Sequence, residues 1–200
     1  MWDKLQKTYA WNHEQVKLYD DLIAAISDGT NPYERDCAFF KGKVRDIEAE
    51  IRAVAPARTD GVIDIIGSEQ VRKHYEPLDM EYYFIALHDG QIIGHISYRG
   101  LHSSNYGDIG YEIDEEYRGN GLAYRALCLL GEILLENGIN EAWIAAEDDN
   151  IASIKTIEKY GGTHIGESLD NKGKTMALYS LAIMKKELQG TARQFARPQS

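Results

Sequence analysis

The chain has 200 residues, 44% hydrophobic and 27% charged, a balance typical of one globular domain with an appendage and unlike a disordered chain. Its formal net charge of -10 argues against a nucleic-acid partner, because phosphate backbones are bound by clustered Lys and Arg. Two distant cysteines, Cys37 and Cys128, and the absence of a long apolar run predict a cytoplasmic chain without disulfides, zinc ribbon, signal peptide or membrane partner.

The first part of the chain predicts helices. Apolar residues recur there at spacings of three and four in two stretches, namely Val16, Tyr19, Ile23 and Ile26, then Val44, Ile47, Ile51 and Val54. Pro56 ends the second stretch, because a proline ring cannot continue the helical hydrogen-bond ladder. We therefore expect an N-terminal helical segment over residues 1–56.

From residue 61 the pattern changes to short apolar runs separated by turn residues. These runs predict strands over 62–66, 82–88, 91–98 and 109–114. Asp89-Gly90 predicts a two-residue hairpin loop, since a type I′ turn needs positive φ at both central positions. Alternation along the fourth strand puts Tyr111 on its apolar face and Glu112 on the opposite one.

The rest of the chain alternates helices and strands. A helix with a wide apolar stripe starts near Gly121 and ends around Gly138, and it is followed by a strand (142–146), a helix (151–160) and a final strand (175–184). The polar tail over 189–200 predicts a loose end. The order predicts an α/β or α+β domain, a central sheet flanked by helices, with ligands at the carboxyl ends of its strands.

The segment from Arg118 to Ala123 predicts an anion site. It lies where a strand gives way to an apolar helix, and Gly119 and Gly121 leave its backbone N–H groups uncovered. A helix N-terminus favours a phosphate ligand, and Arg118 adds a permanent cation. By itself, such a turn is as often a plain connection. It lacks the residues of a nucleotide P-loop and of a dinucleotide fingerprint.

The same residues resemble the coenzyme A signature of the GNAT family of N-acetyltransferases. Arg118-x-x-Gly121-x-Ala123 is similar to the family's Gln/Arg-x-x-Gly-x-Gly/Ala motif. The run 109–114 resembles the family's fourth strand, and 149–162 resembles its second conserved block, in the style of the ribosomal-protein acetyltransferases. The resemblance implies a mixed sheet flanked by helices, an acetyltransferase domain over 57–188, and acetyl-CoA as acyl donor without a metal.

The resemblance also implies which residues contact the cofactor. The backbone around Ile113 would pair with the pantetheine arm, and the loop would hold the diphosphate. The implied cofactor-binding residues are Ile113, Arg118, Gly119, Asn120, Gly121, Leu122, Ala123, Asn150 and Ser153. Asn150 and Ser153 have a plain alternative, because Asn and Ser at a helix start often only cap its N–H groups.

Acetyl transfer to an amine needs a base for the amine and help for the leaving thiolate. Glu112 is the candidate base, with a solvated strand carboxylate as the alternative. The family's usual acid is a Tyr seven residues after the Asn, and here that position is Ile157. Tyr160, which could equally be a packing residue, and Ser153 are the remaining candidate acids.

The acceptor is a primary amine, on a small molecule or on a protein terminus or lysine, and the sequence does not choose between them. The acidic run 147–149 could attract a cationic amine, and the polar loop 100–107 could shape its pocket. His88, His95 and His102 lack the spacing of a metal site. Two alternatives stay open: a coenzyme A-binding sensing module with little turnover, and a structural protein whose helical segment binds a partner. A homodimer is a further possibility.

Overall fold

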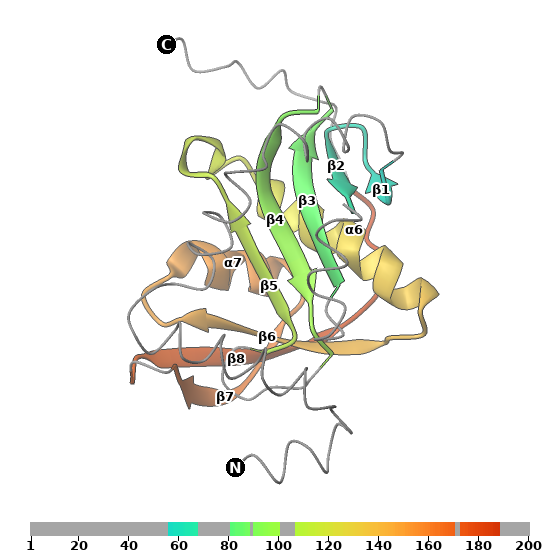
Figure 1. Ribbon diagram of the computed structural model, residues 1–200. Helices are drawn as coiled ribbons and strands as arrows, with labels where there is room; N and C mark the ends of the chain where they lie inside the picture. Colours follow the sequence, from blue (N-terminus) through green and yellow to red (C-terminus); the bar gives the residue numbers. More distant parts are fainter. Residues whose placement is uncertain (1–55, 68–80, 89, 101–106, 171–172, 189–200) are drawn as a thin grey trace, which may run out of the picture.

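The computed structural model describes residues 56–67, 81–88, 90–100, 107–170 and 173–188 (Figure 1). The predicted N-terminal helices, most of the polar loop 100–107 and the tail 189–200 lie outside these ranges. In the described ranges, no helix combines the length and the apolar character needed to cross a membrane.

The described residues form one eight-stranded sheet with the order β1-β2-β3-β4-β5-β6-β8-β7. Every neighbouring pair is antiparallel except β5 and β6, which are parallel. The strands are β1 (Arg58–Thr59), β2 (Ile63–Ile66), β3 (Glu81–Leu87), β4 (Ile92–Tyr98), β5 (Ile109–Ile113), β6 (Glu141–Glu147), β7 (Thr163–Leu169) and β8 (Thr175–Ala182).

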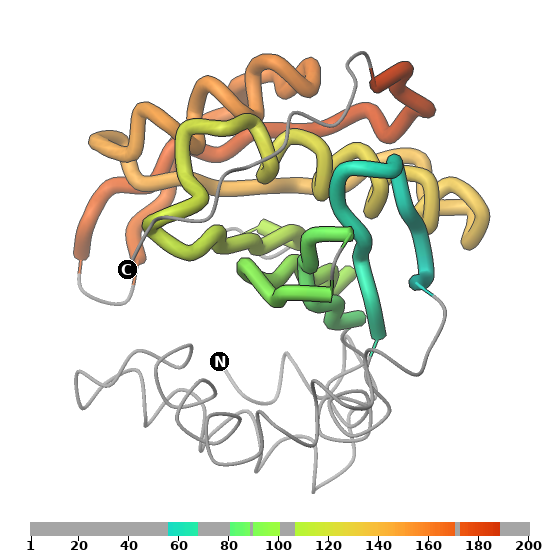
Figure 2. The backbone as a smooth tube through the Cα atoms, turned by 90° about the horizontal axis from the view of Figure 1, so that it is seen from above, coloured from blue at the N-terminus to red at the C-terminus, as the bar shows by residue number. Residues whose placement is uncertain are grey.

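Two α-helices, α6 (Leu122–Glu136) and α7 (Ile151–Tyr160), lie on the same side of the sheet (Figure 2). A short 3-10 helix, η2 (Glu115–Tyr117), links β5 to α6. The apolar stripe of α6 is buried against the sheet and α7, together with the inward side chains of the strands. This core includes Ile63, Ile85, Ile96, Ile109, Leu122, Leu127, Leu130, Ile144, Ile157 and Leu181.

The mixed sheet flanked by helices confirms the predicted fold class, but two strands were missed. β7 is an edge strand whose residues are mostly exposed on both faces, so it lacks the apolar alternation by which strands are recognised in a sequence. β1 has two residues. The predicted turn after β3 also differs, because Leu87 donates its N–H to the Gln91 carbonyl and thus encloses three residues, of which Gly90 has a φ of 85°.

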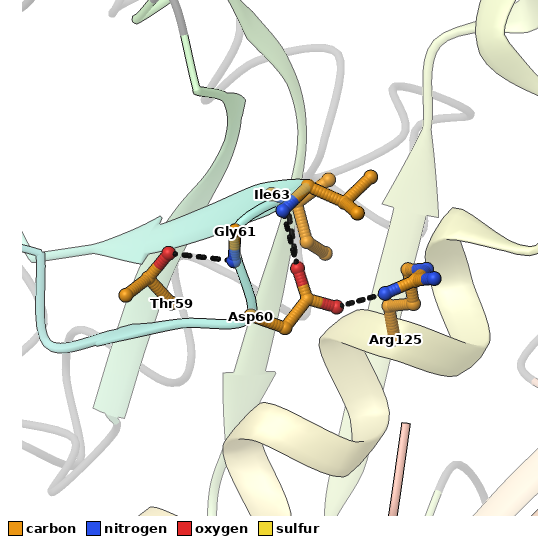
Figure 3. A network of polar contacts seen from close by, with 6 residues as sticks. Thr59, Asp60, Gly61, Ile63 and Arg125 are labelled. Carbon is orange, nitrogen blue, oxygen red and sulfur yellow. Dashed lines mark hydrogen bonds and ion pairs between the residues drawn. The ribbon is translucent and has the colours of Figure 1, made fainter. Parts of the chain in front are cut away.

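A buried ion pair fixes the start of α6 against the β1–β2 turn (Figure 3). Asp60 Oδ1 accepts the N–H groups of Val62 and Ile63 at 2.8 and 2.9 Å, and Oδ2 accepts Arg125 Nη1 at 2.6 Å. The side chains of Asp60 and Arg125 are 6% and 14% exposed. Because Arg125 is in the first turns of α6, the pair holds the amino end of this helix in place.

Removing one partner of this pair should be costly, because the other charge is left buried. We expect Arg125→Met to lower the free energy of unfolding by about 3 kcal/mol. Urea denaturation measures it. Lys174→Met breaks an ion pair at the surface and should change the stability little. Equal effects of the two substitutions would contradict the structural role of the Asp60–Arg125 pair.

Candidate functional site

The sheet opens between its two parallel strands. β5 and β6 are paired at one position, Ile109 opposite Ile144. Beyond it, the strand partner of β5 is β4 alone, and the strand partner of β6 is β8 alone. The two strands therefore diverge toward their carboxyl ends, where ligands bind in open α/β sheets.

Asp108 determines where the opening begins. Its backbone N–H donates to the Trp143 carbonyl at 2.6 Å, and its carboxylate accepts the Trp143 N–H at 2.7 Å. Asp108 is fully buried. Just before it, Gly107 has a φ of 69°, and a Cβ there would lie 2.7 Å from the Ile144 Cα. A glycine and a buried carboxylate thus join β5 to β6 at one end and leave the other end apart.

The loop before α6 lies at this open end. Gly119 and Gly121 have φ values of 77° and 73°, and no atom lies within 4 Å of a Cβ built on either residue. Gly121 is the N-cap of α6 and offers no side-chain cap, and the first turn holds no acidic residue. The first N–H groups of α6 have no side-chain cap from Gly121, so the loop is an open cradle that fits a phosphate group.

The other loop residues have structural contacts. Asn120 Nδ2 donates to the carbonyls of Tyr117 and Arg118 at 3.1 and 3.2 Å and closes the turn. Leu122 is 2% exposed and packs in the core, and Ala123 packs against it. In this structure, the backbone of these last two residues, rather than their side chains, is suited to an anion.

Arg118 is directed toward β5. Its Nε donates to the Ile113 carbonyl at 2.8 Å, and its Nη2 lies 3.4 Å from Glu112 Oε1. The sequence predicts that Arg118 adds positive charge to the loop and that the Ile113 backbone pairs with the cofactor. In the structure the Ile113 carbonyl accepts a hydrogen bond that links the loop to the strand, and two of the predicted site residues, Arg118 and Glu112, are in contact.

Glu112 lies on the face of the sheet opposite the helices. Its cross-strand neighbour on β4 is His95, so the two side chains share that face. The His95 ring stacks on the Tyr82 ring, with the centroids 5.2 Å apart. Burial lowers the pKa of His95 to about 4, and its imidazole is therefore neutral at neutral pH. Sequence analysis assigned His95 no role beside Glu112, although the alternation of side chains along β4 and β5 is the signal that relates the two residues.

The start of α7 faces the other side of β5. Asn150 is the N-cap of α7, and its side chain accepts the Ser153 N–H at 3.1 Å, so the predicted capping contact is present for Asn150. The Tyr111 hydroxyl of β5 is close to Ser153 and Thr156 of α7, whose hydroxyls lower its pKa, while burial raises it more strongly. Sequence analysis assigned Tyr111 to the apolar face and did not consider its hydroxyl.

Tyr160 lies elsewhere. It is 1% exposed, and its hydroxyl donates to the Met184 carbonyl at 3.5 Å. Burial raises its pKa to about 12. Since Ser153 is seven residues earlier in α7, the two are about 10 Å apart along the helix axis. The structure does not bring Tyr160 together with Glu112 or Ser153, and it gives Tyr160 the surroundings of a packing residue. Ile157 is also fully buried.

The acidic run after β6 is partly neutralised. Lys174 Nζ lies 2.6 Å from Glu147 Oε2 and 3.0 Å from Asp149 Oδ1. The electrostatic attraction of the acidic run for a cationic amine is therefore reduced. Within the part of the chain that the structure describes, no three His, Cys, Asp or Glu side chains gather in a way that could hold a metal ion. His102 lies outside that part.

Comparison with known proteins agrees with the motifs. A sequence model of the acetyltransferase (GNAT) family matches residues 49–162, more than half of the chain. No curated protein matches this chain significantly. The solved structure of RimL, a ribosomal L7/L12 alpha-N-protein acetyltransferase in an apo crystal form, is 20% identical with a TM-score of 0.51, and the match covers 64% of this chain and 96% of that one. At this identity the likeness shows the fold alone.

Two further structures share lower scores. The microcin C7 self-immunity acetyltransferase MccE, in complex with acetyl-CoA and AMP, is 23% identical with a TM-score of 0.48, covering 57% of this chain and 67% of that one. The ribosomal-protein-S5-alanine acetyltransferase from Vibrio fischeri is 19% identical with a TM-score of 0.48, covering 69% and 85%.

The junction of β5 and β6 should depend on the Asp108 carboxylate. Asp108→Ala removes the carboxylate that accepts the Trp143 N–H, and we expect the free energy of unfolding to fall by about 2 kcal/mol. Hydrogen exchange at the Trp143 amide should become faster. Asp108→Asn keeps a side-chain oxygen as acceptor and should lower the free energy of unfolding by a smaller amount. Unchanged exchange at Trp143 in the alanine variant would show that the junction does not rest on this carboxylate.

Proposed function

The chain belongs to the acetyltransferase (GNAT) family, and from this premise we propose that it is an N-acetyltransferase that moves an acetyl group from acetyl-CoA to a primary amine. The observation that carries the proposal is the opening between β5 and β6 beside the uncovered amino end of α6. Acetyl-CoA matches both features. Its pantetheine arm can pair with an open strand edge, and its diphosphate requires N–H donors. The MccE structure holds acetyl-CoA.

We assign the binding of the acetyl-CoA diphosphate to the loop before α6. Gly119 and Gly121 are exposed and have no neighbours where a side chain would stand, so a ligand can approach the backbone. The dipole of α6 favours negative charge at this end, and no carboxylate in its first turn opposes it. Asn120 keeps the turn closed, and Asn150 and Ser153 form the opposite edge of the opening.

Acetyl-CoA supplies the activated acyl group, and a residue of the chain removes the proton from the amine. Glu112 is the proposed base. It faces away from the helices, and the Arg118 guanidinium lies beside it. His95, neutral and on the same face, is not a competing cation for an incoming ammonium group. Ser153 is a candidate donor on the other side of β5, whereas the buried Tyr160 is less suited to that role.

The acceptor amine belongs to a small molecule or to a protein terminus or lysine. The spacing of Asn150 and Ser153 resembles that of the ribosomal-protein acetyltransferases, and RimL is named for a ribosomal-protein acceptor, but neither observation chooses between the two kinds of acceptor. We propose that the acetyltransferase domain comprises residues 57–188. The N-terminal segment 1–56 is then a candidate for covering the acceptor side or for forming a homodimer contact.

Binding and turnover test the function together. The chain should bind acetyl-CoA in a calorimetric titration and release thiol when amines or peptide termini are added. Gly121→Asp puts a carboxylate in the diphosphate cradle and should weaken binding at least tenfold. Aspartate tolerates the left-handed backbone there, so the fold should be kept.

The matched control is Gly138→Asp. Gly138 follows the same helix at its other end, with a similar φ of 77° and nothing within 4 Å of a Cβ. This variant should bind as the wild type does. Equal affinity of the two variants would refute the loop assignment. Binding without amine-dependent thiol release would favour the sensing module, and absence of binding in the wild type would overturn the proposed function.

The role of Glu112 has a pH signature. In Glu112→Gln the rate should fall about a hundredfold near pH 7, where the acceptor is mostly ammonium and needs a base. The loss should shrink toward pH 10, where the amine is already neutral. Steady-state rates across this range measure it, with Glu115→Gln, an exposed carboxylate on η2, as control. A loss that is the same at every pH would count against Glu112 as base.

A further inference from the structure

Resting on the proposed acetyl transfer, we propose that Lys159 of α7 binds the 3′-phosphate of coenzyme A and makes the chain selective for coenzyme A over its 3′-dephospho form. Coenzyme A carries this phosphate on the same ribose that carries the diphosphate. A residue that binds it must therefore lie within one sugar of the diphosphate cradle, and it must be a cation with an accessible head group.

Lys159 lies beside the first turns of α6. Its Nζ is 4.2 Å from the centroid of the Tyr124 ring. Tyr124 is three residues beyond Gly121, the N-cap of α6, which corresponds to about 4.5 Å along the helix axis. The last turn of α7 thus brings a lysine to the end of α6 whose N–H groups are proposed to hold the diphosphate.

The Tyr124 ring gives this ammonium group a defined place. The ring is half-buried, and its hydroxyl is close to the Cys128 thiol one turn further along α6. Burial and the Cys128 contact raise the pKa of Tyr124 above its ordinary value, so the phenol stays neutral. Because the face of a neutral aromatic ring attracts a cation, the Lys159 side chain is held over α6.

Lys159 is also accessible to a ligand, because its side chain is exposed. The ring contact uses one side of the ammonium group, and a lysine has three N–H donors, so donors remain for an anion. In the described ranges, the ring contact is not accompanied by an ion pair between Lys159 and a carboxylate. An incoming phosphate would therefore not have to displace a competing anion.

The two arginines near the same end of α6 are already engaged. Arg118 Nη2 lies 3.4 Å from Glu112 Oε1. Arg125 Nη1 lies 2.6 Å from Asp60 Oδ2 inside the buried pair. In a chain with a formal net charge of -10, a second anionic group of the ligand is repelled unless a cation is close to it. Lys159 is the cation that the fold offers beside the cradle for this purpose.

The chemistry of the 3′-phosphate makes it a suitable partner for this lysine. A phosphate monoester carries about −1.5 to −2 charges at pH 7, and a lysine attracts it as a compact point charge. The 3′-dephospho form of coenzyme A lacks this group but keeps the diphosphate and the pantetheine arm. A comparison of the two compounds therefore isolates the contact with Lys159.

The ratio of the two dissociation constants measures the selectivity. Calorimetric titrations give the Kd for coenzyme A and for 3′-dephospho-coenzyme A. We expect the wild type to bind coenzyme A about fivefold more tightly, and Lys159→Met to bind both compounds about equally. Methionine keeps an unbranched apolar chain beside the Tyr124 ring and removes the charge. The preference of the wild type should weaken at high salt, because the contact is exposed.

Lys186→Met is the matched control. Lys186 Nζ also lies over a tyrosine ring, 5.0 Å from the Tyr160 centroid, so this variant loses the same charge and the same kind of contact. Tyr160 packs against Gly131 of α6, ten residues beyond Gly121 and about 15 Å from it along the helix axis. Lys186→Met should keep the preference of the wild type for coenzyme A.

The outcomes separate this inference from the function on which it rests. A wild type that binds coenzyme A and 3′-dephospho-coenzyme A with equal affinity would overturn the phosphate contact and leave the acetyltransferase intact. A preference that survives in Lys159→Met, or that falls equally in Lys186→Met, would overturn the assignment to Lys159. A wild type that binds neither compound would overturn the proposed function as well.

Discussion

The single parallel contact between β5 and β6 is the constraint on which the site depends. If the hydrogen bonds between β5 and β6 continued along both strands, the sheet would have no opening here. The strands are joined at the amino side of this contact, where the Asp108 carboxylate accepts the Trp143 N–H and Gly107 lies close to Ile144. Past this junction the two strands are no longer paired with each other.

The helices on one side of the sheet then define the two ends of the opening. α6 presents its amino end, and the buried Asp60–Arg125 pair holds that end against the β1–β2 turn. α7 begins at the far edge with Asn150 as its cap. A charge pair and a cap, both distant from the proposed chemistry, thus set where a diphosphate and a thioester would lie. This explains why a mutation in the first turns of α6 could affect ligand binding without touching the ligand.

β5 divides the proposed chemistry between its two faces. Glu112 and Tyr111 are neighbours in the chain, and the pleat of the strand directs Glu112 to the face opposite the helices and Tyr111 toward α7.

The sequence by itself determined the elements with strong periodicity, the class of fold, and the glycine loop before α6, because these depend on local backbone preference and on apolar spacing. It missed β7, whose exposed edge carries no such spacing, and it left Tyr160 open between a candidate acid and a packing residue. Only the tertiary structure decided that Arg118 turns toward Ile113 and Glu112, that His95 lies beside Glu112, and that Tyr160 is buried. These are contacts between residues far apart in the chain, and strand register and helix packing, not local pattern, bring such residues together.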